Sequence, residues 1–600
     1  MPLKLLLRGT YLKEQKHTQD LNRVYKLIWP QLNGFYNYFG LILFKKIKIR
    51  YLRLKKLIMK SKIITYCILI IFSNNSLAGP LFVHFKSIKK YIVDVCIYGG
   101  TSAGVIAAYS AQKCGKSVLL IEPGKMLGGM TTGGLGQTDI GNKQAITGLA
   151  RQFYRKIGEE YGVDEQWTFE PHVAQKVMQD YINEGKISVL LQKQLFRVTK
   201  EGMVIKYILI KDAEHAKAAP IQVSAKEFID CTYEGDLMAM SGVSYTIGRE
   251  DNKQYNETLN GFQLAEYHKQ SGGHQIPDGV SPYKTPGSPS SGLIWGISTD
   301  TEQPTGSGDK KIQAYNFRIC LTDSIENSIA ITRPKDYDST KYELLVRLFA
   351  AQPNMRNIED YFIWSLMPNR KTDINNGGGF STDMIGVNYD WPEVSFGERK
   401  KLFEAHVTYT KGLLYFMKTD NRVPEPLRQF VGNWGYPKDE YQDYGHFTSQ
   451  LYIREARRMI GEYVMTEHSC LGAEKVVDGI GLAAYTMDSH NCQRIIVNGM
   501  VKNEGNVEVG GFPPYPISYR SLTPKRNECT NLVVPVCLSA SHIAYGSIRM
   551  EPVFMVLGQS AAIAASMAID ENVPVQYVNV KKLQEKLSAD PFLDKSLPIK

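Results

Sequence analysis

Four residues in the stretch DVCIYGGTSAGVIAAYSAQKCGKSVLLIEP, residues 94–123, have types and spacing that suit one kind of chemistry. Gly99 and Gly104 stand where a nucleotide-binding turn is tightest and where its helix and strand backbones approach each other. Thr101 stands at the middle position, which is usually glycine, and brings a hydroxyl. Glu122 is placed to accept hydrogen bonds from a ribose diol, and its charge argues against the 2′-phosphate of NADP. The pattern predicts a dinucleotide site.

The elements around these residues are the ones that such a site needs. Residues 92–98 predict a strand buried in a parallel sheet, and residues 117–121 predict a second strand. Between them, residues 102–114 carry apolar side chains at helical spacing and end at Gly115. The free amides and positive dipole end of this helix would face a diphosphate. On these residues alone, a strand–helix–strand unit with a glycine turn and no ligand stays open.

A second glycine-rich loop follows directly. The sequence PGKMLGGMTTGGLGQTD, residues 123–139, lets backbone approach a ligand closely, although a flexible linker would have similar glycine content. Gly128, Gly129, Met130 and Thr132 are the residues of this loop that we expect at the cofactor.

Three separated segments, residues 98–134, 225–250 and 535–566, resemble the FAD-dependent oxidoreductases of the glutathione-reductase-like superfamily. The likeness is greatest to a bacterial family related to the flavin subunit of heterodisulfide reductase. In this family the middle glycine is often replaced, as Thr101 replaces it here. The resemblance implies FAD as the cofactor, whereas spacing alone does not separate FAD from NAD.

The second segment, AKEFIDCTYEGDLMAMSGVSYTIGRE, ends a buried strand at Asp230. In related flavoproteins this strand ends near the pyrophosphate, which implies that Asp236 bonds the cofactor's hydroxyls or a bound water. Asp236 also precedes Leu-Met-Ala-Met, so a helix N-cap is the alternative, and both roles are compatible.

The third segment, PVCLSASHIAYGSIRMEPVFMVLGQSAAIAAS, predicts a helix of small residues that begins at Gly558 and points its free amides at the flavin. The resemblance places this region by the isoalloxazine, with Arg549 stabilising an anionic reduced flavin and His542 taking a substrate proton. An ion pair between Arg549 and Glu551 and a structural role for His542 are the alternatives.

Taken together, these segments predict two sets of site residues and no metal ligand. The predicted catalytic residues are His542 and Arg549, and the predicted cofactor-binding residues are Gly99, Gly100, Thr101, Ser102, Ala103, Gly104, Glu122, Gly128, Gly129, Met130, Thr132, Asp236, Gly558, Gln559, Ser560 and Ala561.

The charge of the chain is concentrated in its first 58 residues. The formal net charge is +11, and residues 1–58 carry 13 Lys and Arg but only two acidic residues, so the rest of the chain is neutral. A nucleic-acid partner is therefore not expected. Residues 59–78, MKSKIITYCILIIFSNNSLA, have the basic start, the ten-residue apolar run and the small residues of a secretory signal peptide.

We therefore expect translation to start at Met59 and residues 1–58 to be spurious; a basic extension with a membrane anchor at 63–72 is the alternative. Ten apolar residues are too few to span a bilayer, so no stable anchor is expected, and the protein is expected to be secreted or periplasmic. No C-x-x-C pair is present, which disfavours zinc and iron–sulfur sites, whereas pairing among Cys492, Cys529 and Cys537 stays open.

The fold class that these segments predict is α/β: a Rossmann-like FAD-binding domain of three layers, built on a parallel sheet, with an inserted α+β substrate domain. Its FAD-binding parts are 91–150, 187–250, which includes antiparallel strands, and 531–600. Helical residues 151–186 and the insertion 251–530 form the substrate side.

For two stretches of the insertion, the sequence leaves two structural interpretations open. The charge run Arg454–Arg458 is expected on a helix, and such a run is typical of a solvated charged face. An interior ion-pair network is the less favoured alternative. Tyr515, Tyr519 and Arg520 are expected either to line a substrate cleft or to pack on the surface of the domain.

The expected activity is transfer of a hydride from a small organic substrate to flavin, with an unknown electron acceptor. Because the chain is expected outside the cytoplasm, carbohydrate-derived compounds are the substrate class we expect. An NAD-dependent dehydrogenase and a secreted, non-catalytic flavin-binding module remain as alternatives.

Overall fold

The computed structural model describes residues 88–590, except residue 216 and residues 266–272. The predicted signal peptide at 59–78 and the basic stretch before it lie outside the described residues.

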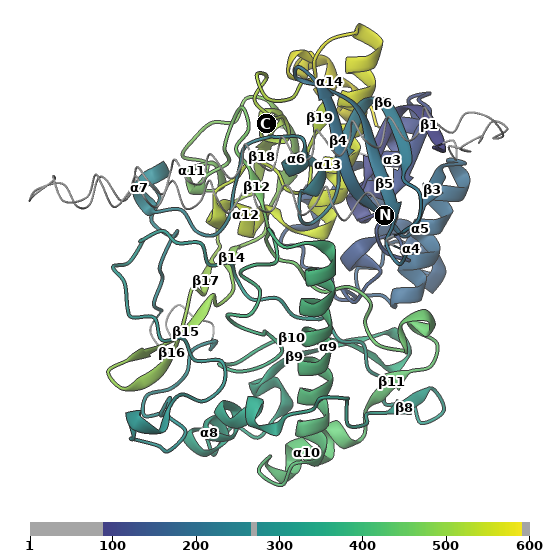
Figure 1. Ribbon diagram of the computed structural model, residues 1–600. Coiled ribbons are helices and arrows are strands. Elements are labelled where there is room, and N and C mark those ends of the chain that lie inside the picture. Colours follow the sequence, from purple (N-terminus) through teal and green to yellow (C-terminus); the bar gives the residue numbers. More distant parts are fainter. Residues whose placement is uncertain (1–87, 216, 266–272, 591–600) are drawn as a thin grey trace, which may run out of the picture. The chain divides into compact units, whose positions relative to one another are not determined.

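One seven-stranded sheet joins strands that are far apart in the sequence (Figure 1). Its strands, in spatial order, are β3 (Ser188–Leu190), β2 (Val118–Ile121), β1 (Lys90–Tyr98), β6 (Ile221–Asp230), β5 (Val204–Asp212) and β4 (Lys193–Glu201), and β19 (Leu532–Val533) also pairs with β6. The pairs β3–β2, β2–β1, β1–β6 and β6–β19 are parallel, and β4, β5 and β6 pair antiparallel. The predicted parallel sheet and the antiparallel strands that follow it are confirmed.

Helices cover one face of this sheet (Figure 1). They are α3 (Ser102–Lys113), α4 (Gly148–Tyr161), α5 (Pro171–Glu184) and α13 (Glu551–Glu571). α3 and α13 pack closely because both carry small residues: a Cβ on Gly558 would lie 2.4 Å from the carbonyl oxygen of Ala103. Among the described helices, α13 alone is long and apolar enough to cross a membrane, and its side chains are largely buried within this packing.

The hairpin β4–β5 covers the other face. Cys96 and Tyr98 of β1 point away from α3 and pack with Leu195 and Ile208 of the hairpin. The backbone N–H of Leu195 donates to the Tyr98 hydroxyl at 2.9 Å. Helices, parallel sheet and antiparallel hairpin therefore form the three predicted layers.

Residues 251–530 combine helices with short two-stranded sheets, as predicted for an α+β insertion, while the predicted domain boundaries stay predictions. The longest helix here, α9 (Phe396–Thr419), begins after Ser395, whose side chain accepts from the N–H of Glu398. The strand pairs are β7 (Tyr245–Thr246) with β12 (Arg458–Met459), β8 (Ser328–Ala330) with β11 (Gly435–Pro437), β9 (Phe362–Met367) with β10 (Lys371–Asn376), β13 (Gly479–Ala483) with β18 (Tyr515–Ser518), β14 (Met487–Ser489) with β17 (Val507–Val509), and β15 (Gln493–Val497) with β16 (Met500–Glu504). The remaining α-helices are α6 (Asp236–Met240), α7 (Asn252–Tyr255), α8 (Glu343–Ala351), α10 (Glu425–Gly432), α11 (Glu467–Cys470), α12 (His542–Ile548) and α14 (Val580–Ser588).

The charge run Arg454–Arg458 is neither helical nor solvated. Its backbone is irregular until β12 begins at Arg458, and its five side chains are buried. The prediction of a solvated helical face was wrong because partners from distant segments neutralise the run: Arg454 pairs with Asp383, and Arg458 pairs with Glu250.

The structure also answers two questions that the sequence left open, the position of Tyr515, Tyr519 and Arg520 and the pairing of the cysteines. Tyr515 and Tyr519 lie in the core, where their hydroxyls donate to Ser547 and to the carbonyl of Val575, and Arg520 pairs with Asp478, so this stretch packs rather than lining a cleft. All eight cysteines of the described ranges are free, and this includes Cys492, Cys529 and Cys537, whose pairing the sequence left open.

Candidate functional site

A cavity of about 320 Å³ lies at the carboxyl ends of β1, β2 and β6, the edge at which α/β sheets bind ligands. Its wall includes Gly99, Thr101, Glu122, Gly129, Thr232, Tyr233, Glu234, Asp236, Trp391, Arg399, Gln450, Leu451 and Ile453. Five predicted cofactor-binding residues therefore meet on this wall: Gly99, Thr101, Glu122, Gly129 and Asp236. The insertion completes the wall with residues that the sequence did not single out, such as Trp391 and Arg399.

The turn at the start of α3 has no room for side chains where glycine stands. A Cβ on Gly99, whose φ is +103°, would lie 2.6 Å from the carbonyl carbon of Cys231. Gly100, Ser102 and Ala103 are buried within the same turn. Thr101 caps the helix: its hydroxyl accepts from the N–H of Gly104 at 3.3 Å and donates to the carbonyl of Cys231 at 2.8 Å. The threonine in place of the usual glycine thus fixes the direction of α3.

Glu122 joins the two glycine-rich stretches. Its carboxylate accepts from the N–H of Gly100 at 2.6 Å and from the N–H of Gly124. Burial raises the pKa of Glu122 to about 7, even though both amides favour the ionised form. A half-buried acceptor on the cavity wall is suited to the ribose hydroxyls that the sequence predicted for it.

The second glycine loop is held by a buried hydrogen-bond network. The N–H of Met130 donates to the hydroxyl of Tyr233 at 2.9 Å, and that hydroxyl donates to Glu551 at 2.6 Å. A Cβ on Gly129 would lie 2.3 Å from the Tyr233 hydroxyl oxygen, so the loop needs glycine there. Thr132, which was also predicted to bind the cofactor, donates its hydroxyl hydrogen to the carbonyl of Leu127 at 2.6 Å. This hydrogen bond links the two ends of the loop around Gly128.

Glu551, which the sequence suggested only as an ion-pair partner for Arg549, is a functional candidate. Its carboxylate instead accepts from Ser102, the first residue of α3, and from Thr131 at 2.8 Å. Burial raises the pKa of Glu551, while these hydroxyls lower it by less. The side chain ties the start of α13 to the start of α3 and to the second glycine loop.

Asp236 is not a helix N-cap. Gly235 occupies the cap position, and Asp236 is the first residue of α6. Its carboxylate binds Arg399 through two hydrogen bonds of 2.6 and 2.9 Å and Arg457 through one of 2.8 Å. Burial raises the pKa of Asp236, but the two guanidinium groups lower the pKa by a larger amount, so the net shift is downward.

Gly558, Gln559, Ser560 and Ala561 do not begin a helix. α13 begins at Glu551, so these residues lie about two turns inside it and have no free amides to offer a flavin. Their contacts are structural: Gln559 accepts from the N–H of Leu149, and Ser560 donates to the carbonyl of Ile480. None of the four lies on the cavity wall.

The two predicted catalytic residues have different surroundings. Both ring nitrogens of His542 are bonded, Nδ1 to Glu455 at 2.7 Å and Nε2 to Ser489 at 2.9 Å, and its side chain is 2% exposed. This is the environment of a structural histidine. Arg549 pairs with Asp488 at 2.9 Å and donates to the Tyr452 hydroxyl at 2.8 Å, and Glu551 is not its partner.

Arg549 belongs to a larger group of charged side chains, which we call the charged cluster. The cluster adjoins the cavity because Tyr452, whose ring lies under the guanidinium groups of Arg454 and Arg549, is flanked in the chain by Leu451 and Ile453 of the cavity wall. Its members are Asp139, Arg318, Asp373, Asp383, Arg454, Asp488, His490 and Arg549. No motif unites them in the sequence, although Arg549 was predicted there as a catalytic residue and Arg454 as part of a charge run.

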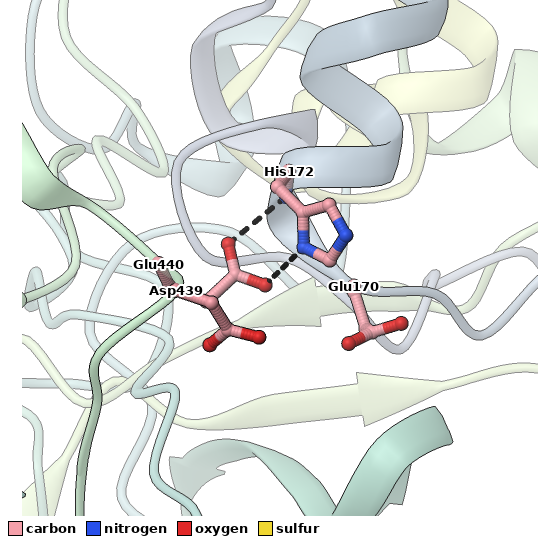
Figure 2. A group of neighbouring side chains, drawn as sticks. All are labelled: Glu170, His172, Asp439 and Glu440. Carbon is pink, nitrogen blue, oxygen red and sulfur yellow. Dashed lines mark hydrogen bonds and ion pairs between the residues drawn. The ribbon is translucent and has the colours of Figure 1, made fainter. Parts of the chain in front are cut away.

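A second cluster of ionisable side chains lies outside the charged cluster and contains Glu170, His172, Asp439 and Glu440 (Figure 2). Nδ1 of His172 lies 2.6 Å from Glu440. The buried ammonium group of Lys371 lies 2.7–2.8 Å from all three carboxylates and supplies the positive charge that a metal ion would supply. The group is therefore an ion-pair network centred on Lys371.

A scan against protein-family models matches residues 94–587 to the family described as FAD dependent oxidoreductase. No curated protein sequence matches the chain significantly.

Three solved structures that match the chain each overlap with about a third of it or less. An L-proline dehydrogenase from P. horikoshii is 21% identical over 29% of this chain and 28% of its own, with a TM-score of 0.17. THI4 from Thermovibrio ammonificans is 17% identical over 34% of this chain and 79% of its own, with a TM-score of 0.21. The flavin-dependent brominase Bmp2 is 20% identical over 27% of this chain and 43% of its own, also with a TM-score of 0.21. None of these likenesses bears on the reaction of this chain.

Proposed function

The chain belongs to the family of FAD dependent oxidoreductases, and from that premise we propose that it removes two electrons from a small organic substrate whose binding site adjoins the cavity. FAD, when bound, supplies the acceptor for the substrate's hydride.

The observation that supports this proposal is the cavity itself, a ligand-sized space whose wall combines side-chain-free turns with the half-buried carboxylate of Glu122. The residues fit FAD. The amides at the start of α3 would hold the diphosphate, because Gly99 and Gly104 leave no side chain in the turn. Glu122 would accept hydrogen bonds from the ribose, and the loop Gly129–Thr131 would leave room for backbone contact with the cofactor.

The charged cluster is the part of the site that would meet the substrate. Its guanidinium and carboxylate groups suit a substrate rich in hydroxyl groups, which supports a carbohydrate-derived compound or another polar alcohol. The acceptor that reoxidises the cofactor is a separate partner, and we propose no identity for it. A relation of this family to the glutathione-reductase-like superfamily and to heterodisulfide reductase stays part of the proposal.

We also propose that the chain is exported through the signal peptide at 59–78. N-terminal sequencing of the native protein should find a start after Ala78. A mature start upstream of Met59 would contradict this.

The function is tested with the purified protein. It should be yellow, and sugars and simple alcohols, screened without oxygen, should include compounds that bleach the flavin absorbance. A folded, colourless preparation that does not bind added FAD would overturn the proposal. A flavin that photoreduction and candidate acceptors cannot cycle would instead favour the non-catalytic module.

A further inference from the structure

His490, in the loop between β14 and β15, is oriented by a carboxylate as general-base histidines are. Its Nδ1 lies 2.9 Å from Oδ2 of Asp383, and Oδ1 of Asp383 lies 2.9 Å from Arg454. Asp383 is fully buried, so this bond fixes the ring and leaves Nε2 as the nitrogen available to accept a proton.

Nε2 of His490 has different surroundings from Nε2 of His542. Nε2 of His490 lies 3.6 Å from Asp488, which is longer than a hydrogen bond. The His490 side chain is 12% exposed, whereas both nitrogens of the sealed His542 ring are bonded. Of these two histidines, His490 is therefore the one that a small molecule can reach.

Charged groups from several segments face the His490 ring. They are Asp383 and Arg454, Asp488 on β14 with its partner Arg549, and His274, whose ring centre lies 6.4 Å away and which pairs with Glu508 of β17. Burial and Arg454 lower the pKa of His490, but Asp383 and Asp488 raise it by more, so the net pKa lies above 6.5.

The position of this pair links it to the cofactor cavity. Arg454, which neutralises Asp383, and Arg549, which neutralises Asp488, both lie against the ring of Tyr452. Tyr452 lies between two residues of the cavity wall, Leu451 and Ile453. The two carboxylates that flank His490 are thus tied through their counter-ions to Tyr452, a neighbour in the chain of two cavity-wall residues.

We propose that His490 is the proton acceptor of the reaction and that the substrate is an alcohol, an inference that rests on the proposed function. Nε2 takes the hydroxyl proton, the hydrogen on the adjacent carbon leaves as hydride to FAD, and the carbon–oxygen bond becomes a carbonyl. The substrate loses two electrons and two hydrogens, and Asp383 acts as a positioning residue.

The first test needs no substrate. Diethyl pyrocarbonate modifies unprotonated imidazole, and mass spectrometry of the FAD-loaded protein at a series of pH values gives the modification rate of each histidine. His490 should react along one titration curve with a midpoint above 6.5, and Asp383→Asn should lower that midpoint. His172, which also pairs with a carboxylate but lies outside the charged cluster, is the matched control, and its midpoint should not move. A His490 as unreactive as His542, or a midpoint below 6.5, would overturn the proposal.

The second test uses any alcohol that bleaches the flavin of the wild type. His490→Gln should keep the yellow colour and reduce the rate of anaerobic bleaching by roughly 10²–10⁴-fold. Asp383→Asn should retain more activity and shift the inflection of the pH–rate profile to lower pH, which a merely structural role would not do. If the wild type bleaches and His490→Gln bleaches equally fast, this inference fails while the proposed function stands. If only substrates without a hydroxyl bleach the wild type, the alcohol assignment fails.

Discussion

Gly104 of α3 faces the carbonyl oxygen of Gly99 so closely that a Cβ on Gly104 would lie 1.9 Å from that oxygen. The contact holds the first turn of α3 against the end of β1, where the diphosphate is expected. We predict that Gly104→Ala abolishes FAD retention and destabilises the fold by about 1–3 kcal/mol or more, because backbone must move to admit the methyl group. Flavin absorbance after gel filtration and urea unfolding measure both effects.

Gly432→Ala is the control for this substitution. Gly432 ends α10 and has no atom within 4 Å of an added Cβ, so alanine there should leave the colour unchanged and should not lower stability. A Gly104→Ala protein with the full flavin content of the wild type would show that the nucleotide is misplaced.

FAD affinity should depend on the protonation of Glu122. In the FAD-free protein this group has a pKa of about 7, and hydrogen bonds from ribose hydroxyls favour its ionised form. Binding therefore releases a proton below that pH, and affinity should fall as pH drops through about 7. Glu122→Gln should weaken binding by about 1.5–3 kcal/mol above that pH and remove this pH dependence. Fluorescence titration of the apoprotein with FAD measures it; an equal pH slope in both proteins would contradict the assignment.

Asp236 should be critical for stability because it neutralises two buried cations. Asp236→Asn leaves Arg399 and Arg457 without that charge, which costs about 3–5 kcal/mol for a buried pair. Lys401→Ala breaks an exposed pair with Glu398 on the same helix as Arg399 and should change the urea midpoint little. If both variants unfold at the wild-type midpoint, the network around Asp236 has no energetic role.

Acid should destabilise the fold through Glu455. Burial raises the pKa of this group, but His542 and Arg458 lower it more, to about 2, from an ordinary value of 4.5. A lowered pKa contributes stability that is present above pH 4.5 and is lost as pH falls toward 2. Glu455→Gln should unfold more readily at neutral pH and lose less stability over that acid range. Urea midpoints at several pH values measure this; parallel curves for the two proteins would show that Glu455 does not control the acid limb.

The sequence was most informative where short-range rules apply. The unit from β1 through α3 to β2 agrees with prediction because glycine turns, helical periodicity and apolar runs act over a few residues. Helices α4 and α5 agree with the helical character predicted for residues 151–186, and Phe153, Val177 and Tyr181 are buried on them. The start of α13 was wrong by two turns, although Pro552 in its first turn was an available signal.

The remaining misses concern charge. Arg454, Glu455 and Arg458 look like a solvated run in the sequence, but each is buried against a partner from another segment. His490 carried no sequence signal, because its partner Asp383 stands 107 residues away.

By itself, the sequence determined the local strand–helix–strand unit, the positions that must be glycine, and, through resemblance, the flavin family. Only the tertiary structure decided which carboxylate meets which cation at the cavity and which of His490 and His542 keeps a reachable nitrogen. The reason is physical: backbone propensity and periodicity act between near neighbours, whereas the pairs Asp236–Arg399 and Asp383–His490 form only after the insertion has packed and excluded water from them.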